Sequence, residues 1–280
     1  MVTEKAHLMI EALNLMGYQA LGIGDDDLTL GRDFLIDLSK KAKFPFLSSN
    51  LIDGESGKRF FQSHLIKEVN GLRIGIFALI APDSFSGPQD PRLKGLTIQN
   101  PIETAQRIIK ELKPNTDLII LLSHLGYPKD AEMAQTVSGI QIIIGSHTGV
   151  SLSYPAIVKD TVILHTPPKG MYAGRFDLAF LGSESGFYNA ATKRSFENNL
   201  ASLNLRLSAK ETPPAEKEQY QKLIGDIQQS LKKLQGKNEF SNIIIPLNEQ
   251  FKELPEISKL IDDYHKTHPP EPDKSSPPKH

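Results

Sequence analysis

Two apolar segments of the chain each end at a histidine. Residues 118–122 lead to His124, and residues 142–144 lead to His147. Loops at the carboxyl ends of parallel strands meet at one crevice, so these two histidines can converge although they are far apart in the chain. Neutral imidazole is a good ligand for zinc, manganese or iron. The alternative is a histidine that only makes a hydrogen bond at a strand end, but the pair together favours a metal site.

A third apolar run, residues 20–23, leads into three adjacent carboxylates, Asp25, Asp26 and Asp27. Neighbouring carboxylates repel one another, so they are stable only when they are solvated, cap a helix or face a cation. One interpretation is a solvated acidic turn. The other is that Asp25 or Asp26 supplies an oxygen ligand beside the two histidines, which completes a mixed nitrogen and oxygen site for a hard or borderline metal.

Other candidates for chemistry are weaker. His165 also ends an apolar run, but two prolines follow it, and a loop-closing role is favoured. Asp263 and His265 lie in a polar helical stretch, where a solvated face explains them. Glycine-rich phosphate loops of the Walker or dinucleotide type and a Gly-x-Ser-x-Gly nucleophile motif are absent from the sequence.

The elements that must position these residues alternate between apolar runs and amphipathic stretches, as α/β architecture requires. Strands are predicted at residues 20–23, 46–48, 74–80, 118–122, 141–144, 161–165 and 175–181. Helices are predicted at residues 6–16, 32–43, 102–112 and 131–137. Runs such as 118–122 are apolar throughout, which indicates strands covered on both faces. We therefore expect a layered α/β sandwich of mixed sheets flanked by helices.

The composition changes to Glu, Lys and Gln towards the C-terminus. It predicts a helix from Thr212 to about Leu234, a short apolar run at 243–245 and a helix at 257–265. The last residues are rich in proline and charge, which predicts disorder. We expect an α/β domain at 1–190, a helical appendage at 191–268 and a disordered tail at 269–280.

Charge and composition limit the classes of partner. The 280 residues contain 32 Lys+Arg and 33 Asp+Glu, a net charge of -1. This balance lacks the basic field of non-specific nucleic-acid binding, so nucleic acid is not expected as a partner. The absence of cysteine excludes disulfides, thiolate metal sites and Cys nucleophiles. No apolar run reaches the ~18 to 20 residues of a membrane span, and the first residues lack the apolar core of a signal peptide, so we expect a soluble chain.

These motifs, in this order, resemble the metallophosphatase domain of the 5'-nucleotidase family, within the calcineurin-like metallophosphoesterases. Residues 14–20, 24–28 and 44–50 resemble its N-x-x-G-Y-D-A, G-N-H-E-F and F-P-x-L-S-A-N segments. Residues 71–77, 123–126 and 144–147 resemble its G-x-K-I-G-V-I, S-H-L-G and G-G-H-S-H segments. The resemblance covers roughly residues 8–182.

The resemblance implies two-metal hydrolysis of a phosphoester, with cations about 3.5 to 4 Å apart. His124 and His147 fall on metal-ligand positions, and Asp25 falls on the position of a ligand asparagine. Asp26 falls on the position of the histidine that protonates the leaving group or stabilises the transition state. The implied substrate is a nucleotide or another small phosphomonoester.

The sequence also departs from the family. The D-x-H motif and the Gly-Asp that bridges both metals are expected before residue 1, which predicts an N-terminally incomplete domain. Gly149 takes the place of the second histidine of G-H-S-H, so one more ligand is lost. An ionised Asp26 only accepts hydrogen bonds and would repel a phosphate. We therefore expect at most one divalent metal ion, Mn²⁺, Zn²⁺ or similar, and impaired hydrolysis.

The alternative to an impaired enzyme is a non-catalytic interaction or sensor module on the same scaffold, within a larger protein that has fused or associated domains. Residues 254–261 resemble the connector that leads to a multihaem cytochrome region in some bacterial relatives, although no C-x-x-C-H motif follows here. The resemblance implies a periplasmic location if the family's usual export applies to a longer form.

Overall fold

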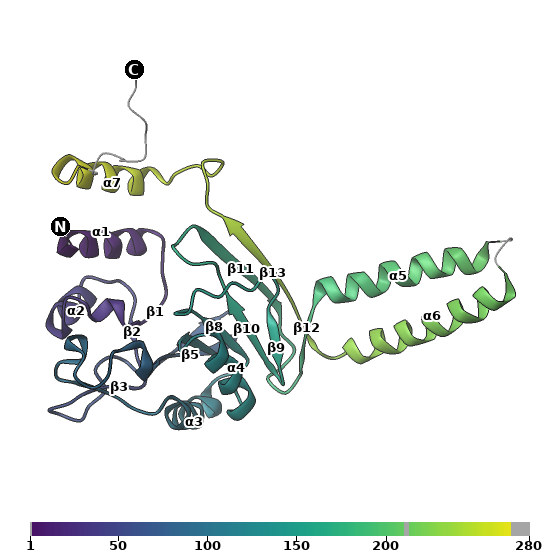
Figure 1. The fold of residues 1–280 in the computed structure, drawn as a ribbon, viewed down its shortest axis with the longest axis horizontal. Helices are drawn as coiled ribbons and strands as arrows, with labels where there is room; N and C mark the ends of the chain where they lie inside the picture. Colours follow the sequence, from purple (N-terminus) through teal and green to yellow (C-terminus); the bar gives the residue numbers. More distant parts are fainter. Residues whose placement is uncertain (1, 210–212, 270–280) are drawn as a thin grey trace, which may run out of the picture.

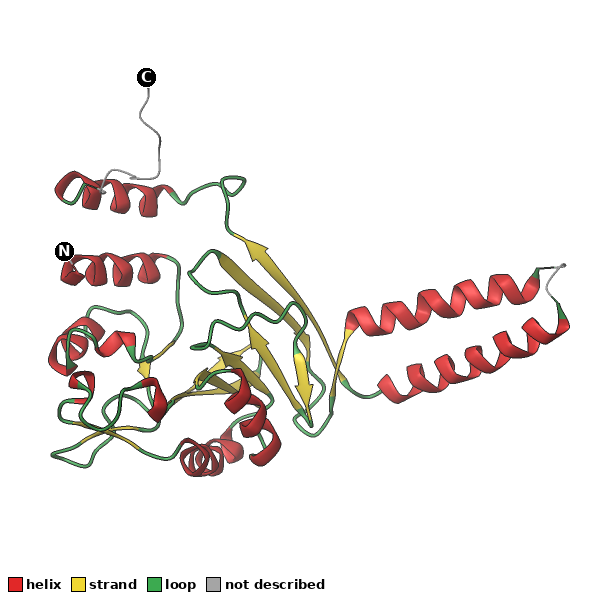
Figure 2. Ribbon diagram, viewed as in Figure 1, coloured by secondary structure: helices red, strands yellow, loops and turns green. Residues whose placement is uncertain are grey.

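The computed structural model describes residues 2–209 and 213–269 of the chain (Figures 1 and 2). Its helices are α1 (Val2–Leu15), α2 (Arg32–Ser39), α3 (Pro101–Leu112), α4 (Tyr127–Thr136), α5 (Ala190–Ser208), α6 (Pro214–Leu234) and α7 (Pro255–Thr267). Its strands are β1 (Leu21–Gly22), β2 (Phe46–Leu47), β3 (Leu51–Asp53), β4 (His64–Val69), β5 (Leu72–Ile80), β6 (Leu96–Ile98), β7 (Leu118–His124), β8 (Ile142–Gly145), β9 (Ala156–Val158), β10 (Thr161–His165), β11 (Tyr172–Ala179), β12 (Phe187–Asn189) and β13 (Asn238–Pro246). From residue 270 on, the predicted disordered tail lies outside the described residues.

A six-stranded mixed sheet forms the centre, in the order β4-β5-β7-β8-β10-β9. The four inner strands are parallel, and β4 and β9 pair antiparallel at the two edges. Ile120 of β7 pairs with Ile142 of β8, so the two histidine-bearing segments are neighbouring strands, as predicted. Their carboxyl ends therefore lie at the same edge of the sheet.

Both faces of this sheet are covered, which explains the uninterrupted apolar runs. Leu79 packs in a buried cluster with Ile108 of α3 and Met133 of α4. The next residue, Ile80, packs in a second cluster on the opposite face, with residues of α1, α2 and β2. The small parallel pair of β1 and β2 lies on this second face, where the backbone of Gly22 approaches Leu122 so closely that an added Cβ would be 3.0 Å from the Leu122 Cβ. The expected layered α/β architecture is thus confirmed.

The C-terminal part combines helices with a strand. Helices α5 and α6 form an antiparallel hairpin that projects from the body, and α7 returns to lie beside α1 (Figure 1). Strand β13 lies between α6 and α7 in the chain, and it pairs antiparallel with β11 and parallel with β12. The boundary predicted at residue 190 coincides with the start of α5, but β13 ties the later segment to strands of the earlier one. The division into a domain and an appendage remains a prediction.

Several elements escaped the sequence analysis. Helix α5 was not predicted, although its half-buried residues Phe196, Leu200, Leu203 and Leu207 follow helical spacing. The run at 243–245 proved to be the end of the longer β13, whose first half is polar. Strands β3, β6, β9 and β12 have only three residues each, too few to show an alternating pattern.

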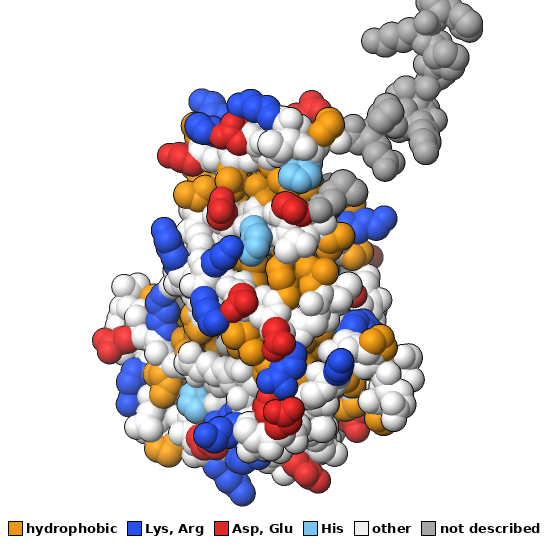
Figure 3. All heavy atoms as spheres, turned by 90° about the vertical axis from the view of Figure 1, so that its left-hand side faces the viewer, with side chains coloured by type: hydrophobic (Ala, Val, Ile, Leu, Met, Phe, Trp, Pro, Cys, Tyr) orange, Lys and Arg blue, Asp and Glu red, His pale blue; other side chains and the backbone are white. Residues whose placement is uncertain are grey.

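The surface that carries α1 and α7 shows Lys and Arg side chains interspersed with Asp and Glu, with apolar side chains between the helices (Figure 3). This view agrees with the near-zero net charge of the sequence. Within residues 2–209 and 213–269, no helix is both long and apolar enough to cross a bilayer.

Candidate metal centre

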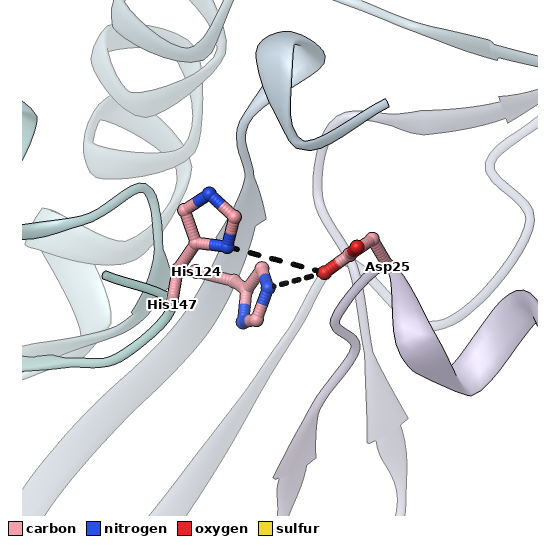
Figure 4. A group of neighbouring side chains, drawn as sticks. All are labelled: Asp25, His124 and His147. Carbon is pink, nitrogen blue, oxygen red and sulfur yellow. Dashed lines mark hydrogen bonds and ion pairs between the residues drawn. The ribbon is translucent and has the colours of Figure 1, made fainter. Parts of the chain in front are cut away.

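Asp25, His124 and His147 converge at the carboxyl edge of the central sheet, with their polar atoms directed toward one another (Figure 4). Oδ1 of Asp25 lies 2.8 Å from Nε2 of His124 and 4.0 Å from Nδ1 of His147. The two imidazole centroids are 4.7 Å apart, well within the limit of about 10 Å that a shared metal site requires. One ligand atom from each residue lies within 4.8 Å of the others.

The parallel pairing of β7 and β8 brings the two histidines together. Ser123 pairs with Gly145, so the residues that follow these positions leave the sheet side by side. His124 then packs against the backbone of Gly24, where an added Cβ would lie only 2.8 Å from Cε1 of the imidazole. His147 has a φ of 83°, a left-handed conformation that is uncommon for a non-glycine residue. Such strain persists only where surrounding contacts hold it.

The three adjacent carboxylates have three different environments. Asp25 faces the histidines, and its side chain is 15% exposed. Asp27 accepts a hydrogen bond of 2.8 Å from the backbone N–H of Gly24 and so closes the turn. The Asp26 side chain is 99% exposed and lies outside the group formed by Asp25 and the histidines. The structure therefore does not bring Asp26 together with the other predicted site residues.

Arg92 holds the second oxygen of Asp25. Its Nη1 donates a hydrogen bond of 2.6 Å to Oδ2, the carboxylate oxygen that does not face His124. Arg92 is itself fixed by two hydrogen bonds to Asp90, and its guanidinium lies over the ring of Phe85 at 4.9 Å. Burial alone would raise the pKa of Asp25, but the hydrogen bonds with His124 and Arg92 outweigh it and lower that pKa. Asp25 is thus an ionised, oriented carboxylate.

A buried polar network lies beneath the site. His165, at the end of β10, makes a 2.7 Å hydrogen bond through Nε2 with Asp130 of α4, and both side chains are almost completely buried. The other oxygen of Asp130 accepts a hydrogen bond from the hydroxyl of Ser123. Asp130 therefore joins α4 to the ends of both β7 and β10. His165 has a structural role, but its partner belongs to a helix rather than to the loop that was expected to close on it. Asp263 of α7 pairs with Lys259 and Lys266 instead.

The chain is similar to known 5'-nucleotidases in sequence and in fold. No family model matches the chain. Over 205 residues it is 26% identical to a 5'-nucleotidase of Vibrio cholerae. The alignment covers 62% of this chain and 37% of that protein. A 5'-nucleotidase precursor of Thermus thermophilus aligns with a TM-score of 0.57 and 27% identity over 63% of this chain and 38% of the other. These similarities support a metallophosphatase domain of the 5'-nucleotidase type in this chain.

The fold alone extends further along the chain than the sequence similarity. The calcineurin-like phosphoesterase YfkN of Bacillus subtilis aligns with a TM-score of 0.63 at 19% identity, covering 95% of this chain and 75% of the other. The chain spans less than two fifths of the length of the Vibrio cholerae and Thermus thermophilus proteins. Any activity of those longer proteins is therefore only a proposal for this chain.

The donor set of this metallophosphatase domain fits one divalent ion. Ligands about 2 Å from a Zn²⁺ ion lie about 3 to 4 Å from one another, which is close to the spacing of Asp25, His124 and His147. Two imidazoles and a carboxylate suit Zn²⁺ or Mn²⁺. Since Arg92 occupies Oδ2 of Asp25, only Oδ1 of this carboxylate faces the histidines. Within the described residues, the cluster offers no second carboxylate to bridge two ions.

Sequence reasoning missed the residues that hold the ligands in place. Arg92 lies in a loop 67 residues from Asp25, and nothing in its local sequence indicates the contact. Ser84, whose Oγ lies 3.4 Å from Nε2 of His147, is equally remote. Ser146 could have been found, because it directly precedes His147 and follows a predicted strand. Its Oγ lies 3.1 Å from Nδ1 of His124.

Proposed function

We propose that this domain is a metal-dependent phosphoester hydrolase of the 5'-nucleotidase type whose activity is impaired in the 280-residue chain. The observation that supports it best is the convergence of Asp25, His124 and His147 on one point. These three side chains would hold a single divalent ion, Mn²⁺ or Zn²⁺. A bound ion of this kind supplies Lewis-acid polarisation of a phosphoryl oxygen.

The impairment follows from the charges around the site. Asp26, the residue proposed at the acid position, is exposed to solvent and 3.9 Å from Nη1 of Arg92. An ionised carboxylate accepts hydrogen bonds but donates none, so in that form Asp26 has no proton to give to a leaving group. With Asp25 and Asp27 beside it, it also repels an anionic phosphate. Arg92 offsets part of this negative charge.

The proposed substrate class is a nucleotide or another small phosphomonoester. It rests on the names of the relatives, which are 5'-nucleotidases in Vibrio cholerae and Thermus thermophilus. AMP is therefore the first substrate to test.

The second proposal is a non-catalytic interaction or sensor module on the same scaffold. The exposed position of Asp26 favours it, because the residue at the proposed acid position does not point into the cluster. In this proposal, Asp25, His124 and His147 hold an ion that stabilises the fold without turnover.

Elemental analysis of the purified chain, together with phosphate release from AMP in the presence of Mn²⁺, distinguishes these proposals. An impaired enzyme binds at most one ion and releases phosphate slowly, and His124→Gln abolishes the residual rate. A non-catalytic module binds one ion, and its phosphate release is the same as that of His124→Gln. Two bound ions with rapid turnover would overturn both proposals.

A further inference from the structure

Ser146 lies between the two strand ends that form the site. Its backbone N–H donates a hydrogen bond of 2.9 Å to the carbonyl oxygen of Ser123, the residue before His124. Its hydroxyl oxygen lies 2.9 Å from the same carbonyl and 3.1 Å from Nδ1 of His124. The serine is therefore attached to the end of β7 at two points, and its side chain contacts the imidazole of a proposed metal ligand.

The chemistry of these groups sets the direction of the hydrogen bonds. A neutral imidazole has one N–H, so when an ion is bound at Nε2 the proton of His124 is on Nδ1 and is donated to the Ser146 hydroxyl. That hydroxyl then donates its own single proton to the carbonyl oxygen of Ser123, which only accepts. Without an ion, the contact between Nε2 and Asp25 is a hydrogen bond that needs a proton on Nε2, and the ion would displace that proton. Nε2 is the nitrogen that faces Oδ1 of Asp25, at 2.8 Å.

We propose that Ser146 is a positioning residue that commits His124 to bind a divalent ion through Nε2. This inference rests on the proposed function, since it concerns the ion of that site. A hydrogen bond to the outer ring nitrogen fixes the tautomer and the ring orientation of a metal-bound histidine. The G-G-H-S-H segment that this region resembles has glycine at the position of Ser146, so the hydroxyl is a feature of this chain.

The contact at the second histidine differs. Nε2 of His147 lies 3.4 Å from Oγ of Ser84, a longer separation than that between Ser146 and His124. Ser84 is also anchored differently, through its carbonyl oxygen, which accepts a hydrogen bond from Arg92. The hydroxyl with a fixed acceptor for its proton is therefore that of Ser146, and the inference applies to His124.

Titration calorimetry with Mn²⁺ and with Zn²⁺ tests the role of Ser146 in the full 280-residue chain. Ser146→Ala should weaken the affinity about 10- to 100-fold, the usual cost of losing such an outer partner. Ser146→Thr keeps the hydroxyl and should restore most of the affinity. Ser151→Ala, at an exposed position of the following loop, is the matched control and should bind like the unmodified chain. Thermal unfolding of each variant checks that it is folded.

A spectroscopic measurement separates orientation from a general loss of structure. In the Zn²⁺-loaded chain, ¹⁵N spectra of labelled histidine should show a ring with a protonated Nδ1 and a metal-bound Nε2, absent from His124→Gln. Ser146→Ala should lose this single pattern. Equal affinities for the chain and Ser146→Ala, or failure of Ser146→Thr to restore binding, would overturn the role of Ser146 and leave the metal site standing. A chain that binds neither ion would overturn both.

Discussion

Arg92 donates a 2.6 Å hydrogen bond to Oδ2 of Asp25, while Oδ1 of the same carboxylate faces His124 at 2.8 Å. The carboxylate is therefore shared between a guanidinium on one side and an imidazole on the other. In the segment that this region resembles, the residue at this position is asparagine, which is neutral. Arg92 compensates the charge that aspartate adds.

This relationship predicts an energetic coupling between the two residues. Arg92→Met leaves Asp25 with one partner fewer, whereas in Asp25→Asn there is no charge for Arg92 to compensate. We expect the destabilisation by Arg92→Met to be smaller in the Asp25→Asn background, with a coupling free energy of about 1 to 2 kcal/mol. Urea unfolding of the four proteins of this double-mutant cycle measures it. Additive effects would show that the observed hydrogen bond contributes nothing to stability.

The acid side of the stability profile should depend on Asp90. Its pKa lies well below the ordinary value, because the Arg92 side chain and then the Ser86 backbone N–H donate hydrogen bonds to the carboxylate. A pKa lowered in the folded state gives stability that is complete above the unfolded value of about 3.9 and is lost as the pH falls further. Asp90→Asn should therefore have a lower melting temperature at pH 7.

The same variant should also show a shallower decline of stability below about pH 4, since asparagine does not titrate. Thermal unfolding between about pH 7 and about pH 2.5 checks both the lower melting temperature at neutral pH and the shallower decline in acid. Parallel declines for the chain and for Asp90→Asn would show that this carboxylate is not a source of the acid sensitivity.

The arrangement of the central sheet was predictable from the sequence. The residues that hold the proposed metal ligands in position were not. The apolar runs at 118–122 and 142–144 have few alternatives to adjacent, doubly covered strands, and their pairing brings His124 and His147 together. Asp25 was a candidate because three carboxylates follow a strand. The environment of each carboxylate depends on distant loops, however. Arg92 lies 67 residues away, and its contact with Asp25 arises only in the folded chain.

Gly24 should be essential for the position of His124. A Cβ at Gly24 would lie 2.8 Å from Cε1 and 3.0 Å from Nδ1 of that imidazole, so Gly24→Ala must move the ring. We expect it to weaken Zn²⁺ or Mn²⁺ binding by at least about tenfold, since a misplaced ligand loses its orientation. Gly225→Ala is the matched control, because nothing lies within 4 Å of its added Cβ and alanine favours the helix α6. Equal affinities in calorimetry would contradict the proposed ring position.

The buried pair of Asp130 and His165 should dominate the stability of the sheet edge beneath the site. The two side chains are 0% and 1% exposed, and their 2.7 Å contact joins α4 to β10. Removing one partner leaves the other buried and unpaired, a change that costs about 3 to 5 kcal/mol when the pair is ionic. We therefore expect Asp130→Leu or His165→Leu to reduce the free energy of unfolding by several kcal/mol.

The pair of Lys259 and Asp263 on α7 offers an exposed comparison. The Lys259 side chain is 77% exposed and the Asp263 side chain 45%, so Lys259→Met should change the unfolding midpoint little. The double variant Asp130→Leu with His165→Leu removes both polar groups and should be less destabilised than the sum of the two single variants, because neither partner is then left alone. Urea unfolding of the single and double variants gives the answer. If the two single changes cost no more than Lys259→Met, or if they simply add, the network does not stabilise the edge that carries His124.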